Sequence, residues 1–370
     1  MDKKICCIFN YPPHYRKNVY SLMDKKLNCD FYFGKNVPGS ALKEMDCSQL
    51  CGFKSRFKNF ILKGKIIWNQ DTLKLLFKKE YDRYILSVDT ICISEWLFLL
   101  GAKLIGKRTF LWCHGWYGNE GLGAKIRKKN FYRLSSGLLL YSEYAQKLLL
   151  KEGFQKEHMT VIANSLDYDN QLKLRKSLIR TSIYSKHFGN DCPVVLFIGR
   201  LESKKKLNNI LYMANKLRSQ HQPVNIIYIG KGTDMAHLQK EAAKMKLESS
   251  VWFFGPCYDE AKIAELIFNA DICLSPGNVG LTSIHALTYG TPVITHNNFA
   301  HQMPEFEAII DGKNGTFFEE NNLDDMIRVV SEWLYRYPSK TQEIIDACYH
   351  IIDEKYNPYY QIEILKRFVR

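Results

Sequence analysis

The 370-residue sequence contains no run of about 18 uncharged apolar residues, so we expect no membrane-spanning helix. It has 11 cysteines but no Cys-x-x-Cys pair. Cys47 and Cys51 come nearest to one, yet no histidine or cysteine stands at metal-ligand spacing from them. Most of the other cysteines lie in apolar runs, which is typical of buried free thiols in a reducing compartment. We therefore expect a cytoplasmic protein.

Tandem repeats and low-complexity segments are also missing, and the first residues lack the features of a signal peptide. The start, MDKKICCIFNYPPHYRK, has a short apolar stretch with no small-residue cleavage site after it, which predicts a first β-strand. With 46% hydrophobic and 24% charged residues, the composition is typical of a globular protein. The length is sufficient for two domains with substantial cores.

The net charge of +14 is concentrated in the first half of the chain. Residues 1–170 hold 28 Lys and Arg against 16 Asp and Glu, or +12, whereas residues 171–370 hold 24 against 22, or +2. Basic and aromatic residues interleave in FKSRFKNFILKGKIIW, KLLFKK and GAKIRKKNFYR. This pattern fits a solvated basic face or a patch that attracts an anionic membrane surface. Nucleic acid is the weaker interpretation, because no zinc-finger or RNP-like signature accompanies the charge.

Short apolar runs alternate with amphipathic helical patterns in two successive series. The first series contains KKICCIFNY, CDFYFG, DRYILSV, RTFLWCHG and GLLLYS, and the second contains PVVLFIG, PVNIIYIG, SVWFFG, DICLSPG and TPVITH. Nearly continuous apolar runs are typical of parallel strands covered on both faces. The sequence therefore predicts an α/β protein with two doubly wound, Rossmann-like domains, residues 1–185 and 192–355, that face a cleft.

The polar residues of the second series gather at predicted strand ends. Arg200 directly follows the first strand, after Gly199, and Lys205 comes five positions later. A forked guanidinium and an ammonium suit a pyrophosphate. The stretch CLSPGNVGLTSIHALTYGTPVITH places a loop rich in Gly and Asn before a short helix that begins at Leu281 or Thr282. A helix N-terminus behind such a loop offers unpaired N–H groups to an anion.

These segments resemble retaining glycosyltransferases of the family 4 type, which have the GT-B fold. The resemblance rests on VVLFIGRLESKKKLNNIL, IIYIGKGTDMAHLQKEAAKMKLESSVWFFGP, LIFNADICLSPGNVGLTSIHALTYGTPVITH and PEFEAIIDGKNGTFF, which cover most of residues 193–320. YPPHYRKNVYSL and TFLWCHG match more loosely. In this family the nucleotide-sugar lies on the C-terminal domain and the acceptor on the N-terminal domain. The last helix, here within residues 356–370, usually crosses back to the first domain.

The resemblance implies roles for individual residues. Arg200 and Lys205 would hold the donor diphosphate and stabilise the leaving nucleotide, and His114 would lie near the anomeric carbon. Arg16 would lie on the acceptor side. The donor-binding residues implied are Gly199, Asn278, Val279, Gly280, Leu281, Thr282 and His285. Glu305 and Glu307 both lie near the place where the family has an acidic residue, and the alternative stays open.

The family motif is changed at two positions. Members of the family carry two glutamates eight positions apart around this loop, one for the donor sugar and one for the ribose. In this sequence Gly277 stands at the first position and His285 at the second. A neutral imidazole can accept a hydrogen bond from a ribose hydroxyl, but glycine cannot replace a carboxylate. We therefore expect Asn278 or backbone amides to contact the donor sugar.

The resemblance thus predicts a metal-independent, retaining hexosyltransferase that needs no cofactor. It would use a nucleotide-diphosphate sugar. The basic, aromatic-rich first half of the chain suggests a glycan or lipid-linked acceptor at a membrane face, in cell-surface polysaccharide biosynthesis, with peripheral attachment to the inner face of the membrane. The main alternative is an inactive GT-B protein that binds nucleotide-sugar or glycan as a partner subunit. A nucleotide-sugar epimerase is a further alternative, although the loss of two carboxylates counts against its acid–base chemistry. The last alternative is a nucleic-acid-binding protein.

Overall fold

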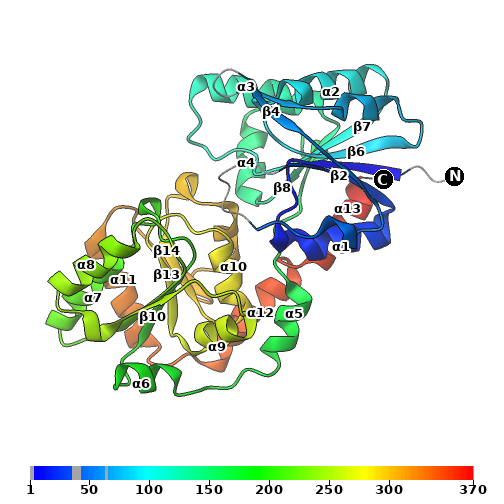
Figure 1. Cartoon of the computed structure of the whole chain (residues 1–370). Helices are drawn as coiled ribbons and strands as arrows, with labels where there is room; N and C mark the ends of the chain where they lie inside the picture. The colour runs from blue at the N-terminus through cyan, green and yellow to red at the C-terminus, as the bar shows by residue number, and fades with distance from the viewer. Residues whose placement is uncertain (1–3, 36–42, 63–65, 370) are drawn as a thin grey trace. The chain divides into compact units, whose positions relative to one another are not determined.

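The computed structural model describes residues 4–35, 43–62 and 66–369, which form two compact units (Figure 1). The first unit comprises Met1–Asp167 and Asn357–Arg370, and the second comprises Tyr168–Tyr356. The sequence pattern had assigned residues 168–185 to the first domain, but the structure places them in the second unit. Helices α5 (Tyr168–Arg175) and α6 (Ile183–Phe188) both pack on α9 (Glu260–Asn269).

For α6, the reason for this correction lies in one aromatic side chain. The stretch around YSKHFGNDC is polar enough to suggest a linker, yet Tyr184 within it is buried. Its hydroxyl donates to the carbonyl oxygen of Leu266 at 2.7 Å. A buried aromatic side chain with a satisfied hydroxyl anchors the segment to the second unit.

The first unit is built on a seven-stranded parallel sheet with the order β3-β2-β1-β6-β7-β8-β9. The strands, in that order, are Phe53–Phe57, Cys29–Gly34, Lys4–Phe9, Tyr81–Ser87, Arg108–Cys113, Gly137–Leu140 and Met159–Val161. Strands β4 (Asn59–Leu62) and β5 (Ile66–Asn69) form a separate antiparallel pair. The basic cluster FKSRFKNFILKGKIIW therefore supplies the edge strand β3 and this pair.

Helices cover both faces of this sheet, as the alternation predicts. On one face α1 (Lys17–Leu27) and α13 (Pro358–Phe368) pack against each other and share a core with strand residues such as Phe110. On the other face α2 (Ile93–Leu104), α3 (Leu122–Leu134) and α4 (Glu143–Lys151) cover residues such as Leu111. Because successive side chains of a strand point to opposite faces, β7 contributes to both cores. The last helix of the chain thus belongs to the first unit.

The second unit is built on a six-stranded parallel sheet with the order β12-β11-β10-β13-β14-β15. The strands, in that order, are Val251–Gly255, Asn225–Ile229, Val194–Ile198, Ile272–Ser275, Val293–His296 and Gly315–Phe318. The strand order reverses between β10 and β13. At such a switch point two neighbouring strands lead to helices on opposite faces of the sheet, and a ligand can bind at the loops between strand and helix.

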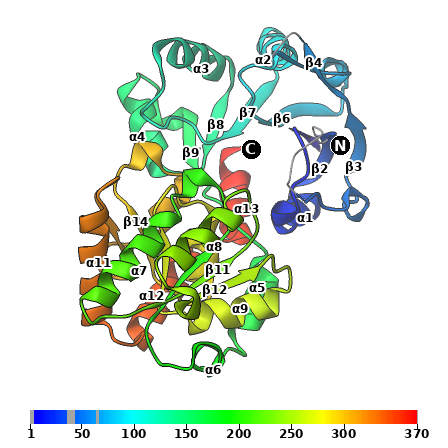
Figure 2. The ribbon, with the colours of Figure 1, turned by 60° about the vertical axis from the view of Figure 1, so that its left-hand side comes forward.

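The helices of the second unit form two groups with the strands between them (Figures 1 and 2). One group contains α7 (Asn208–Ser219), α8 (Met235–Lys244) and α11 (Leu323–Arg336). The other contains α5, α9, α10 (Leu281–Thr288) and α12 (Gln342–Glu354). This arrangement confirms the predicted doubly wound architecture. Among the residues that the structure describes, no helix is long and apolar enough to cross a membrane.

Candidate functional site

The loops that follow β10 and β13 touch each other at the switch point of the second unit. The backbone N–H of Gly277 donates to the carbonyl oxygen of Lys205 at 2.9 Å. The Lys205 ammonium donates to the main-chain oxygen and to Oδ1 of Asn278, at 2.7 and 2.9 Å. A Cβ atom at Gly277 would lie 2.2 Å from the carbonyl oxygen of Lys204. Only glycine therefore fits where the family has its first glutamate.

Two positive side chains lie beside this contact. Burial lowers the pKa of Lys205 to about 8, and the charges of Lys204 and Arg200 lower it further. Lys205 is thus still mainly charged at pH 7, in a position where water solvates it poorly. Arg200 has a side chain that is 58% exposed, and its guanidinium contacts Glu202 at 2.9 Å. An incoming anion would favour the charged form of Lys205 and could draw Arg200 away from Glu202.

The first turn of α10 presents backbone N–H groups without acceptors beside the same two loops. Gly280 caps the helix without a side-chain hydrogen bond. Within the described part of the chain, the N–H groups of Gly280, Leu281 and Thr282 have no acceptor. The Thr282 hydroxyl donates to the carbonyl oxygen of Ile198, at the end of β10, at 2.9 Å. This bond holds the amino end of α10 beside Gly199, so Gly199, Lys205, Asn278 and the first turn of α10 come together.

Val279 plays a different part from the one predicted. Its side chain is buried, and its N–H donates to Oε1 of Gln302 at 2.6 Å. This amide is therefore committed inside the protein, and Val279 shapes the loop. The structure also places one of the two nearby glutamates. Glu305 is buried, and its Oε2 lies 3.9 Å from a Cβ atom built on Gly280, which places it beside the loop.

His285 lies one turn into α10 and contacts a carboxylate that the sequence pattern did not reveal. Its Nε2 is 2.9 Å from Oε1 of Glu260, in the first turn of α9. The same oxygen accepts hydrogen bonds from Gln171 and from the Tyr289 hydroxyl, both at 2.8 Å. Burial alone would raise the pKa of Glu260, but these hydrogen bonds, His285 first among them, lower it to about 2. Glu260 is therefore a carboxylate at neutral pH.

The first unit brings His114 and Arg16 into one pocket of about 290 Å³. Burial lowers the pKa of His114 to about 4, and the charges of Arg16 and Lys128 contribute, so its imidazole is neutral at pH 7. The His114 ring lies 4.9 Å from that of Tyr141. The Arg16 guanidinium stands over Trp112 at 4.9 Å, and its buried Nε has no hydrogen-bond partner within the described residues. The pocket thus combines a neutral imidazole with a fixed positive charge.

Comparisons with known proteins agree with this architecture. Residues 180–348 match the family described as "Glycosyl transferases group 1". A glycogen synthase of Mycobacterium tuberculosis is 28% identical over 124 residues, which are 33% of this chain and 29% of that protein. The chain thus matches less than a third of the length of this curated relative.

Solved structures resemble the whole chain. Anabaena Alr3699/HepE in complex with UDP has a TM-score of 0.73 at 16% identity and covers 98% of this chain and 99% of its own. The lipopolysaccharide outer core galactosyltransferase WaaB has a TM-score of 0.70 at 16% identity, with 98% of both chains covered. Sucrose-phosphate synthase of Thermosynechococcus elongatus has a TM-score of 0.69 at 13% identity, with 99% and 98% covered. The predicted GT-B fold is confirmed.

The Glu260 network generates a prediction about stability and pH. Its pKa falls from about 4.3 in the unfolded chain to about 2 in the folded protein. A depressed carboxyl pKa stabilises the protein above the unfolded pKa, and this stabilisation is lost as the pH falls towards the folded pKa. Glu260→Gln should therefore lower the free energy of unfolding by up to about 3 kcal/mol at pH 7, and by about half of that near pH 3.

Thermal unfolding of both proteins between pH 7 and pH 3 checks this expectation. Glu265→Gln, on the same helix but in a partly exposed pair with Lys262, is the control and should change stability by less than about 1 kcal/mol. If Glu260→Gln lost the same free energy of unfolding at every pH, that result would contradict the charged network.

Proposed function

Since residues 180–348 match the group 1 glycosyl transferases and the chain has the GT-B fold, we propose that the protein is a retaining glycosyltransferase. It takes a sugar from a nucleoside-diphosphate donor and transfers it to an acceptor hydroxyl. The observation that carries the proposal is the convergence of Lys205, Arg200 and the free amides of α10 at one switch point. HepE, a structure with the same fold, binds UDP.

The diphosphate fits this constellation chemically. Its two phosphates need several donors and positive charges, and the amino end of α10 supplies N–H groups with a favourable dipole. Lys205 acts as a point charge, and Arg200 donates in a fork. These groups stabilise the nucleotide as its negative charge develops, which is the main requirement of a retaining transfer through a short-lived ion pair. In this proposal no metal ion is needed to neutralise the leaving group.

The ribose is assigned to Glu260 with His285. Oε1 of Glu260 is occupied by His285, Gln171 and Tyr289, whereas Oε2 accepts no hydrogen bond from the described residues. A charged acceptor beside α10 is what two ribose hydroxyls require. His285 thus holds the carboxylate in place, and Glu260 supplies the group that the family motif has lost from α10.

His114 and Arg16 are assigned to the acceptor side of the reaction. A neutral imidazole can donate from one nitrogen and accept at the other, so His114 can hold hydroxyls near the anomeric carbon. WaaB acts on lipopolysaccharide outer core, and by analogy we place this protein in cell-surface polysaccharide biosynthesis with a glycan or lipid-linked acceptor. One observation favours the inactive alternative: Gly277 leaves no room for the family's sugar-binding glutamate. An inactive protein would bind the nucleotide but release no sugar from it.

Nucleotide binding tests the donor site. We expect one of UDP, GDP, ADP, CMP and dTDP to stabilise the protein by about 2.7 kcal/mol at 100 times its dissociation constant. For units of this size this is a shift of a few degrees in a thermal-shift assay. Arg200→Ala/Lys205→Ala should lose the shift, because the diphosphate loses both cationic side chains.

Lys216→Ala/Lys240→Ala is the charge-matched control, since both lysines are exposed on α7 and α8, and it should keep the shift. A flat panel with the wild-type protein would contradict the donor site. A shift without sugar transfer or donor hydrolysis would instead support the inactive alternative.

We also propose that one face of the first unit attaches to an anionic membrane. Along α2 the side chains of Ile93, Leu97, Leu100 and Leu104 recur on one side of the helix and are 41–78% exposed. Helix α2 contacts α3, β5 and the 3-10 helix η4 (Thr72–Phe77), and Figure 1 shows α2 and α3 side by side. These neighbours add the exposed apolar side chains of Ile66, Phe77, Leu122 and Ile126, and β4, the partner strand of β5, adds Phe60.

The exposed apolar face lies in the basic half of the chain. Lys103 on α2 and Arg127 on α3 are both exposed between the apolar residues. Apolar side chains inserted among lipid headgroups, with basic residues that meet anionic lipid, form the usual interfacial arrangement. The charge therefore favours a lipid surface over a protein partner.

Leu97→Ser/Leu104→Ser tests the membrane face. Because burial of an exposed leucine contributes about 1.5–3 kcal/mol, we expect binding to phosphatidylglycerol vesicles at low salt to weaken at least about ten-fold. Co-sedimentation measures it, with Ile179→Ser on the second unit as control. Equal binding of the wild type to phosphatidylcholine vesicles, or unchanged binding of the variant, would contradict the proposal.

A further inference from the structure

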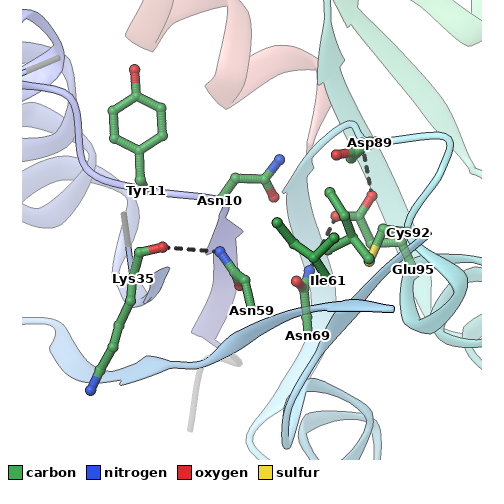
Figure 3. A pocket seen from close by; sticks show the side chains of 10 residues that line it. Asn10, Tyr11, Lys35, Asn59, Ile61, Asn69, Asp89, Cys92 and Glu95 are labelled. Carbon is green, nitrogen blue, oxygen red and sulfur yellow. Dashed lines mark hydrogen bonds between the residues drawn. The ribbon is translucent and has the colours of Figure 1, made fainter. Parts of the chain in front are cut away.

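The first unit contains a second pocket, of about 170 Å³, beside the β4–β5 pair (Figure 3). It lies where the chain leaves β1 and β6, the two strands between which the strand order of the first sheet reverses. The N–H of Asn10 donates to the Ser87 hydroxyl at 2.8 Å and ties the two strand ends together. The pocket therefore occupies the switch point of the first sheet, where ligands bind in folds of this kind.

Two amide side chains present unused polar atoms to this pocket. Asn10 has no side-chain hydrogen bond within the described residues, and Figure 3 shows its amide near the centre of the lining. Asn59, on β4, donates from Nδ2 to the carbonyl oxygen of Lys35 at 3.1 Å. Its Oδ1 is buried and has no hydrogen-bond partner among the residues that the structure describes. A buried acceptor without a partner costs stability unless a ligand or water donates to it.

A carboxyl pair forms the opposite side of the pocket. Oε2 of the buried Glu95 accepts from the N–H of Asp89 at 3.0 Å, and its Oε1 accepts from Nδ2 of Asn69 at 3.4 Å. Glu95 is thus a positioning residue that fixes the loop. Oδ1 of Asp89 accepts from the N–H of Ile91, whereas Oδ2 has no partner within the described residues. Asp89 also lines the pocket that contains His114, so the two pockets share a wall.

The charges around the pocket disfavour an anionic ligand. Burial raises the pKa of Glu95 and of Asp89, which shows that the site already tolerates negative charge poorly. The only cationic side chain among the lining residues that the structure describes is that of Lys35, and its ammonium points away from the others in Figure 3. Ile61 adds an apolar wall. The volume is below the 300–1,000 Å³ typical of drug-sized ligands, so one small ring fits.

We propose that this pocket binds an uncharged sugar ring. Vicinal hydroxyls both donate and accept, which matches an amide at Asn10, an acceptor at Asn59 and a second acceptor at Asp89. The C–H face of the ring packs on Ile61. The identification of this ring as the acceptor terminus rests on the proposed function, whereas the binding site itself does not.

The test uses methyl glucoside and methyl galactoside as neutral probes and glucuronate as the anionic probe, titrated by saturation-transfer NMR in the presence and absence of UDP. The neutral probes should bind and glucuronate should not. Asn10→Ala should weaken binding about five-fold, which corresponds to one net hydrogen bond of about 1 kcal/mol. Asp89→Asn, which keeps the acceptor for Ile91, should weaken it similarly. Asn130→Ala, exposed on α3, is the control.

Each outcome decides the proposal. No sugar binding, stronger binding of glucuronate, unchanged binding by Asn10→Ala and Asp89→Asn, or displacement of the sugars by Ca²⁺ would overturn it. Measuring UDP binding as well distinguishes a failure of the sugar pocket from a failure of the proposed function. Arg200→Ala/Lys205→Ala should lose UDP but keep the sugars, whereas Asn10→Ala should keep UDP and bind the sugars about five-fold more weakly. Sugar binding in a protein that ignores every nucleotide would support the pocket and contradict the transferase.

Discussion

The candidate donor site depends on one backbone contact, the approach of Gly277 to the loop after β10. The N–H of Gly277 and the ammonium of Lys205 both bind across this contact, and Asn278 accepts from Lys205 twice. A strand order that reverses between β10 and β13 brings the two loops together, and only a residue without a side chain can stand at their junction. The position of the proposed phosphate donors follows from it.

The same contact accounts for the changed glutamate motif. A side chain at position 277 would collide with the Lys204 carbonyl oxygen, so a carboxylate cannot return there without a change of backbone. At position 285 the imidazole reaches Glu260 on the neighbouring helix, and three hydrogen bonds keep that carboxylate charged. We infer that Glu260 on α9 supplies the carboxylate that the family motif carries on α10. The two changes therefore have different consequences, one steric and one electrostatic.

Parallel strands were predictable from the sequence because burial on both faces makes them continuously apolar, as in β10 and β11. The loop before α10 was predictable because glycine and asparagine mark its tight turn. Glu260 was not, since its contact with His285 joins two helices and depends on packing. The β4–β5 pair was also missed, because the lysines before and between its strands in the sequence suggested a charged surface. The predicted end of the first domain was wrong. Helix α6 belongs to the second unit because Tyr184 is buried there, although the residues around it are polar.

The most direct test of the account compares UDP with 2′,3′-dideoxyuridine diphosphate by isothermal titration, in the wild type and in Glu260→Gln. A hydrogen bond to a charged group contributes about 1.5–3 kcal/mol, so the wild type should prefer UDP at least about ten-fold. Glu260→Gln should reduce this preference to a few-fold while it still binds the diphosphate. A wild-type protein that binds both nucleotides equally, or a variant that keeps the full preference, would contradict the assignment of the ribose to Glu260.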